Sequence, residues 1–143
     1  MLKIKKISHV AVAVENIDEA LAKYALALGL APTSREFVAS QKVEAALLPI
    51  GDASIELIAP QGNDGVKKFL EKRGPGLHHL AIEVEGIESA LTFLKSIGVQ
   101  LIDETPRVGA HGHKVAFIHP KATGGLLVEL VELVEPISGH DPH

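Results

Sequence analysis

A short phrase occurs twice in this chain, and no other feature of the sequence constrains its fold more. Residues 7–15 read Ile-Ser-His-Val-Ala-Val-Ala-Val-Glu, and residues 77–85 read Leu-His-His-Leu-Ala-Ile-Glu-Val-Glu. At a constant offset of 70 (79 − 9), His9 corresponds to His79 and Ala11 to Ala81. The match continues through five further identical pairs: Val14 and Val84, Glu15 and Glu85, Ile17 and Ile87, Ala20 and Ala90, Leu21 and Leu91. Because the self-match spans strand and helix positions alike, it predicts two copies of one module.

Each copy shows the periodicity of a strand followed by a helix. From residue 79 to 84, His79 and Ala81 fall on one side, and Leu80 and Ile82 on the other, which is typical of a strand with one face against a core. Helical spacing predicts helices at 17–28 and 87–97, ended by glycines. Strands are predicted at 33–39, 43–49 and 54–58 in the first copy, and at 99–103, 114–119 and 126–132 in the second. Both copies therefore have the order β-α-β-β-β.

Four strands cannot bury both faces of a sheet alone, but two such sheets side by side can curl around a shared cavity. We therefore expect an α+β fold in which two βαβββ modules form a curled, eight-stranded mixed sheet around a metal-binding cavity. The modules are predicted at about 4–60 and 76–133, within one domain of 143 residues. A linker helix is expected within 61–75, and a loose C-terminal tail at 134–143.

Composition excludes several classes of function. The formal charge is −4 with no basic run, which argues against nucleic acid as a partner. The chain has no cysteine, so thiolate metal sites and cysteine nucleophiles are excluded. No signal peptide or run of 18 apolar residues is found, so we expect a cytoplasmic protein with no membrane segment.

A carboxylate lies in the middle of each copy's last strand. Ser-Ile-Glu-Leu-Ile around Glu56 resembles Leu-Val-Glu-Leu-Val around Glu129, at an offset of 73 (129 − 56). A carboxylate buried alone among aliphatic residues is costly, and a cation offsets that cost. The paired His9, Glu56, His79 and Glu129 thus predict an N2O2 site for a divalent first-row metal, with water completing the coordination.

The other candidate residues lack this paired support. The position of His78 in the first copy is occupied by Ser8, and alternation predicts that His78 faces the other side of its strand. His111, His113 and His119, on a loop and a strand end, are candidates for substrate contact. Alternation alone predicts that Glu44, beside Ala46 and Leu48, is exposed.

Further phrases carry a resemblance to a known superfamily. They are Val-Glu-Ala-Ala-Leu-Leu-Pro at 43–49, Gly-Leu-His-His at 76–79, Gly-Ala-His-Gly at 109–112, His-Pro-Lys at 119–121 and Gly-Leu-Leu-Val-Glu-Leu at 125–130. Over residues 4–133 the chain resembles the vicinal oxygen chelate superfamily, and more narrowly the methylmalonyl-CoA epimerase family. The resemblance implies a homodimer, a CoA thioester substrate, and a metal held by His9, Glu56, His79 and Glu129. Cobalt is the expected metal, with zinc, manganese, nickel or magnesium as alternatives.

The resemblance also implies a reaction. It would interconvert (2R)- and (2S)-methylmalonyl-CoA through an enolate, with Glu44 and Glu129 as the two acid/base groups. Some family members have Gln at the position of Glu56, and others lack a Glu at that of Glu44. Two alternatives remain open: a glyoxalase-type isomerase acting on a glutathione thiohemiacetal, and a metal-free small-molecule-binding protein of the same fold. Lys121 is a further candidate, for a phosphate of CoA.

Overall fold

The computed structural model describes residues 1–134, and its strands form one mixed sheet. In sheet order they are β2 (Ser34–Val38), β3 (Val43–Ile50), β4 (Ala53–Pro60), β1 (Lys3–Ala13), β5 (Gly76–Glu85), β8 (Val128–Glu132), β7 (Lys114–Ile118) and β6 (Arg107–Val108). Within residues 1–134 the fold also has three α-helices, α1 (Ile17–Leu28), α2 (Asp64–Arg73) and α3 (Ile87–Ser96), and two short 3-10 helices, η1 (Ala110–Gly112) and η2 (Pro120–Thr123). The predicted eight-stranded α+β architecture is confirmed.

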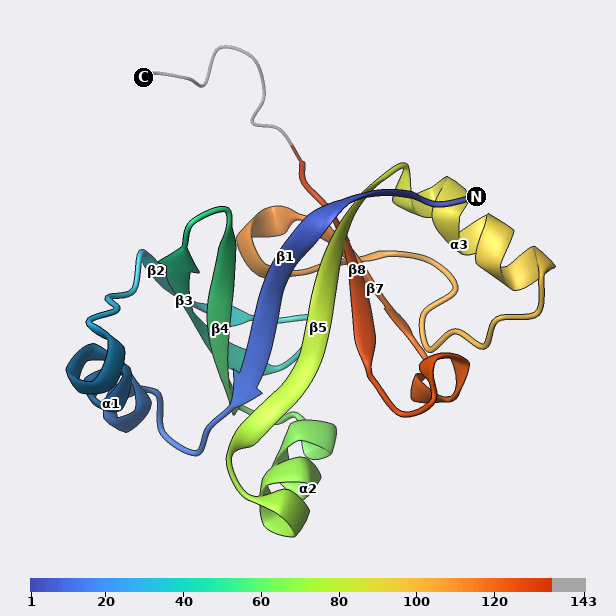
Figure 1. Cartoon of the computed structure of the whole chain (residues 1–143). Helices are drawn as coiled ribbons and strands as arrows, with labels where there is room; N and C mark the ends of the chain where they lie inside the picture. Colours follow the sequence, from blue (N-terminus) through green and yellow to red (C-terminus); the bar gives the residue numbers. More distant parts are fainter. Residues whose placement is uncertain (135–143) are drawn as a thin grey trace.

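The sheet has an internal two-fold relationship. β1 and β5 pair antiparallel at its centre, and each also pairs in parallel with the last strand of its own module, β4 or β8. Strand order within the two halves is therefore the same when read outward from the centre. Figure 1 shows the sheet curling between α1 at one end and α3 at the other, with α2 near the lower ends of β1 and β5.

Successive residues of each strand point to opposite faces of the sheet, and apolar side chains on these faces pack against the helices. One cluster joins α1 to the outer face of the first module, with Val12, Ala46, Leu48 and Leu57 packed around Ile17. The matching cluster packs α3 against β5, β7 and β8 through buried aliphatic residues. The strand residues that alternate with these face inward, where Ala11, Val43 and Ile58 pack against α2. This inner face carries the candidate site.

Helix α1 begins and ends where the sequence predicts. The side chain of Asn16 accepts a hydrogen bond from the backbone N–H of Glu19 (2.9 Å), which caps the first turn. The chain leaves the helix at Gly29, whose φ of 68° is a left-handed conformation that favours glycine.

One predicted strand is wrong. Residues 99–103 form no regular strand, although Leu101 bridges to Ile118 and three backbone hydrogen bonds join the segment to residues 117 and 119. The short edge strand lies instead at Arg107–Val108, where a loop was predicted. The carboxylate of Asp103 accepts the backbone N–H of Phe117 (2.8 Å), so a side chain occupies a donor that a continuous edge strand would use. Apart from Val134, the predicted tail lies outside the described residues.

Candidate metal centre

Two rows of side chains across the inner face of the sheet carry the site. Each row joins a histidine, an alanine and a glutamate on three neighbouring strands: His9, Ala81 and Glu129 in one, and His79, Ala11 and Glu56 in the other. Both alanines are fully buried. Because the middle residue of each row is so small, the longer side chains on either side can approach one another above it.

The structure brings all four predicted ligands close together. His9 Nε2 lies 3.2 Å from Glu129 Oε1 and 3.3 Å from Glu56 Oε1, and His79 Nε2 lies 3.1 Å from Glu129 Oε1. All four residues are buried, with 8% exposure or less. The ligand atoms of His9, His79 and Glu129 all lie within 4.8 Å of one another, so this group could bind a metal ion.

The charges of the site fit a bound cation. His9 Nε2 is buried and makes no well-aligned hydrogen bond, although two carboxylate oxygens lie near it. Burial lowers the pKa of His9, but the carboxylates of Glu129 and Glu56 outweigh burial and raise it to about 10. Burial raises the pKa of Glu129, but the imidazoles of His79 and His9 lower it overall. In the metal-free protein a proton on His9 therefore offsets the carboxylate charge, and a divalent cation would do so more fully.

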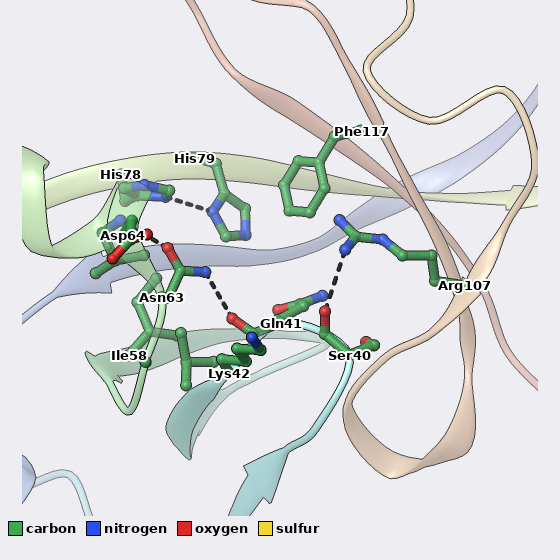
Figure 2. Close-up of a pocket in the computed structure, with 13 residues that line it drawn as sticks. Ser40, Gln41, Lys42, Ile58, Asn63, Asp64, His78, His79, Arg107 and Phe117 are labelled. Atoms are coloured by element: carbon green, nitrogen blue, oxygen red, sulfur yellow. Dashed lines mark hydrogen bonds between the residues drawn. The ribbon is translucent and has the colours of Figure 1, made fainter.

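The residue before each histidine also faces the inner side of the sheet. Ser8 Oγ lies 3.1 Å from His9 Nδ1, and His78 Nδ1 lies 2.9 Å from His79 Nδ1. Figure 2 shows the rings of His78 and His79 together at one wall of a cavity. The prediction that His78 faces the other way is wrong, because an extra residue in the strand breaks the alternation on which it depended.

Gln41 reaches the site from the turn between β2 and β3. Its side-chain Nε2 donates a hydrogen bond to Glu129 Oε2 (3.2 Å), although the two residues are 88 positions apart in the sequence. The side chain of Asn63 donates to the carbonyl of Gln41 (2.6 Å), and Arg107 donates to the carbonyl of Ser40 (3.1 Å). The turn is thus held by the residue that caps the linker helix α2 and by the second module. Sequence analysis missed Gln41, since nothing in a single turn glutamine indicates a contact so distant in the chain.

Two cavities adjoin the site. One, of about 320 Å³, is lined by His78, His79 and Phe117 together with the turn that carries Gln41 (Figure 2). The other, of about 210 Å³, contains the site's remaining predicted ligands: His9, Glu56 and Glu129. Gln41 lines both cavities.

Glu44 is the predicted site residue that the structure does not bring to this group. Glu56 on β4 pairs with Leu47 on β3, so Leu47 faces inward with it. Side chains alternate along a strand, and Glu44, three residues from Leu47, therefore faces outward. There the Glu44 carboxylate accepts a hydrogen bond from Arg35, which also donates to Asp18 of α1 (2.6 Å). The Glu44 carboxylate therefore belongs to an ion-pair group on the outer face.

The remaining histidines take different positions. His111 and His113, which the sequence predicts as candidates for substrate contact, line the smaller cavity. His119 accepts the backbone N–H of Lys121 (3.0 Å) and so caps η2.

Comparisons with known proteins agree with this geometry. Residues 8–117 match the Glyoxalase/Bleomycin resistance protein/Dioxygenase superfamily. The chain is 44% identical to the uncharacterized protein YqjC of Bacillus subtilis over 130 residues, which are 90% of this chain and 93% of that protein. It is 38% identical to methylmalonyl-CoA epimerase from Mycobacterium tuberculosis, whose crystal structure superimposes with a TM-score of 0.87 over 92% of this chain and 90% of that one.

A third comparison concerns a protein solved with a ligand. A Streptomyces coelicolor methylmalonyl-CoA epimerase variant in complex with 2-nitronate-propionyl-CoA is 28% identical, with a TM-score of 0.87 over 94% of this chain and 100% of that one. This chain therefore belongs to the glyoxalase, bleomycin resistance protein and dioxygenase superfamily, in which methylmalonyl-CoA epimerases are among its close relatives.

Proposed function

We propose that this chain is a metal-dependent epimerase that interconverts (2R)- and (2S)-methylmalonyl-CoA. The observation that carries the proposal is the buried group of His9, His79 and Glu129 on the inner face of the sheet, beside two cavities. The epimerase relatives support the substrate class, because one of them was solved with a propionyl-CoA derivative.

His9, His79 and Glu129 would hold the cation, and we propose Glu56 as the fourth ligand because its Oε1 lies 3.3 Å from His9 Nε2. Two imidazoles and two carboxylates suit a divalent first-row metal, and cobalt is the expectation from the family resemblance. When bound, such a cation supplies Lewis acidity that stabilises the negative charge developing on the thioester oxygen.

Glu129 is the residue to which we assign proton transfer. The C2 proton of the substrate lies between a thioester and a carboxylate, and its removal requires a base within hydrogen-bond reach. Oε1 of Glu129 is directed at the two imidazoles, whereas Oε2 is turned toward the amide of Gln41, which lines both cavities. Oε2 is therefore the oxygen to which we assign proton transfer on one face of C2.

Epimerisation also needs a second acid/base group on the opposite face of C2. The sequence predicts Glu44 for this role, and the assignment stays a prediction; the geometry, in which the carboxylate pairs with Arg35 on the outer face of the sheet, argues against it. A homodimer and a cytoplasmic location likewise remain expectations from the family resemblance. No helix among residues 1–134 is long and apolar enough to cross a bilayer.

A substrate comparison tests the proposal. Protein loaded with Co²⁺ is incubated with (2R)-methylmalonyl-CoA and, separately, with a glutathione thiohemiacetal, each with and without a chelator. We expect the CoA thioester to be epimerised only when metal is present, and the glutathione adduct to be left unchanged. Turnover of the glutathione adduct alone would favour a glyoxalase-type isomerase, and failure to take up any metal would favour a metal-free binding protein.

A further inference from the structure

The strands that carry His9 and His79 share an irregularity immediately before the histidine. Where β1 and β5 pair, the register skips Lys5 and Ser8 on β1 and His78 on β5, so the residue before each site histidine has no partner on the other strand. An unpaired extra residue in an antiparallel pair is a β-bulge, which redirects the side chains around it. The bulges at Ser8 and His78 occupy equivalent positions of the internal repeat (78 − 8 = 70).

The bulges change which side chains face the cavities. In a regular strand, the residue before an inward-facing histidine points outward. Here Ser8 lines the cavity beside His9, and His78 lines the cavity beside His79. The preceding apolar residues, Ile7 and Leu77, are turned outward instead and are 51% and 71% exposed. Each module thus exposes an apolar side chain and turns the polar side chain next to its histidine toward a cavity.

Both polar side chains contact the same atom of the following ring. Ser8 Oγ lies 3.1 Å from His9 Nδ1, and His78 Nδ1 lies 2.9 Å from His79 Nδ1. In both histidines Nε2 is the nitrogen that faces the carboxylates of the site. A histidine that binds a cation through Nε2 carries its proton on Nδ1, and that N–H needs an acceptor.

We propose that Ser8 and His78 are paired positioning residues, which accept the Nδ1–H of His9 and His79 and thereby hold each Nε2 toward the cation. This inference rests on the metal site of the proposed function. The proton of His78 then lies on its own Nε2, and its ring is supported by an edge-to-face contact with Phe69 (5.0 Å between centroids). The same role is filled by a hydroxyl in one module and by an imidazole in the other.

Metal affinity tests the proposal without reference to turnover. Ser8→Ala and His78→Leu remove the acceptor, whereas Ser8→Thr and His78→Asn retain one. Ser54→Ala is the matched control, because Ser54 lines the same cavity as Ser8 and pairs with His9 across β1 and β4. Co²⁺ affinity is measured by competition with a chelator, and the absorption spectrum of the bound Co²⁺ reports its ligand geometry.

Removal of either acceptor is expected to weaken Co²⁺ binding by roughly 10- to 100-fold and to alter the Co²⁺ spectrum, as for other residues that orient a metal ligand. Ser8→Thr, His78→Asn and Ser54→Ala are expected to bind as the unaltered protein does. Thermal unfolding of the metal-free variants identifies any that lose affinity only through lost folding. At such a position the conservative variant decides, and a folded Ser8→Thr or His78→Asn that binds Co²⁺ roughly 10-fold more weakly would overturn the proposal.

The outcomes separate this inference from the proposed function. Acceptor-free variants that bind Co²⁺ as tightly as the unaltered protein, or a Ser54→Ala loss of the same size, would overturn the inference alone. Unaltered protein that binds Co²⁺ but epimerises nothing would overturn the proposed reaction and leave the positioning roles supported by the affinity data. Unaltered protein that binds no Co²⁺ would overturn both.

Discussion

At the scale of single residues, the chemistry of this protein concentrates on Glu129. One carboxylate oxygen faces the imidazoles of His9 and His79, and the other accepts the amide of Gln41. A carboxylate buried to 3% exposure requires such partners on both oxygens, because an unpaired buried charge is strongly destabilising. The two oxygens therefore differ in their surroundings, and Oε2 is the one that contacts Gln41, a residue that lines both cavities.

Glu44 can be tested by a change that keeps its shape. The geometry predicts that Glu44→Gln keeps turnover, because the carboxylate lies on the outer face and pairs with Arg35. The measurement is kcat and KM for methylmalonyl-CoA, with Glu129→Gln as the matched comparison. If Glu44→Gln instead lost roughly 10²-fold in kcat with metal still bound, the sequence-based acid/base assignment would be supported and the outward placement would not describe the working enzyme.

Metal binding should depend on pH through His9. Its pKa is raised to about 10, so the metal-free protein carries a proton there throughout the neutral range. A cation must displace that proton, so affinity should rise with pH by up to about tenfold per unit below pH 10. Calorimetry at pH 6 to 8 in buffers of different ionisation enthalpy measures both the affinity and the proton released.

The same linkage acts on the stability of the metal-free fold. The folded pKa of His9 is above the unfolded value of 6.5, so its stabilising contribution is complete below pH 6.5 and is lost as pH rises toward about 10.

Metal affinity that stayed constant between pH 6 and 8, with no proton released on binding, would contradict the described charge state of His9.

At the scale of strands and helices, most of the fold follows from periodicity. Alternation and the repeat predict the central strands and α1 and α3, because one apolar face of each is buried against another element. The bulge at His78 could not be predicted, since strand alternation assumes continuous pairing. The edge strand was misplaced because the Asp103 side chain, far from its partner in sequence, takes a backbone donor of β7.

The predictable part of the site has the same limit. His9, Glu56, His79 and Glu129 could be identified because the repeat states each position twice. Gln41 has no counterpart in the repeat, and its contact with Glu129 depends on how closely the β2–β3 turn of the first module approaches β8 of the second. Contacts of this kind depend on the curl of the whole sheet, which strand patterns do not encode.

Close packing beside β6 gives a prediction for one glycine. A Cβ on Gly109 would lie 2.7 Å from Cγ1 and 3.0 Å from Cγ2 of Val115, a buried residue on β7. Gly109→Ala should therefore destabilise the fold by about 1–3 kcal/mol, as overpacking does elsewhere. Denaturant unfolding measures the change, with Gly76→Ala as the control because a Cβ there meets nothing within 4 Å. Equal stability of the two variants would show that the β6–β7 segment packs less tightly than described.

At the scale of the whole molecule, the candidate centre belongs to neither module alone. Each module supplies one histidine and one glutamate, and the antiparallel pairing of β1 with β5 brings the two halves together (Figure 1). Glu129 of the second module lies 3.2 Å from His9 of the first. The duplicated sequence is thus a requirement of the site, because a single module would supply only half of the ligands.

The central claim is that this joint site removes and returns the C2 proton of methylmalonyl-CoA. The most direct measurement is to incubate metal-loaded protein with (2R)-methylmalonyl-CoA in deuterated water and to follow deuterium at C2 together with its configuration. The account predicts exchange accompanied by epimerisation, abolished by a chelator and strongly reduced in Glu129→Gln. Absence of exchange in protein that demonstrably holds its metal would contradict the claim, while leaving the fold and the metal centre intact.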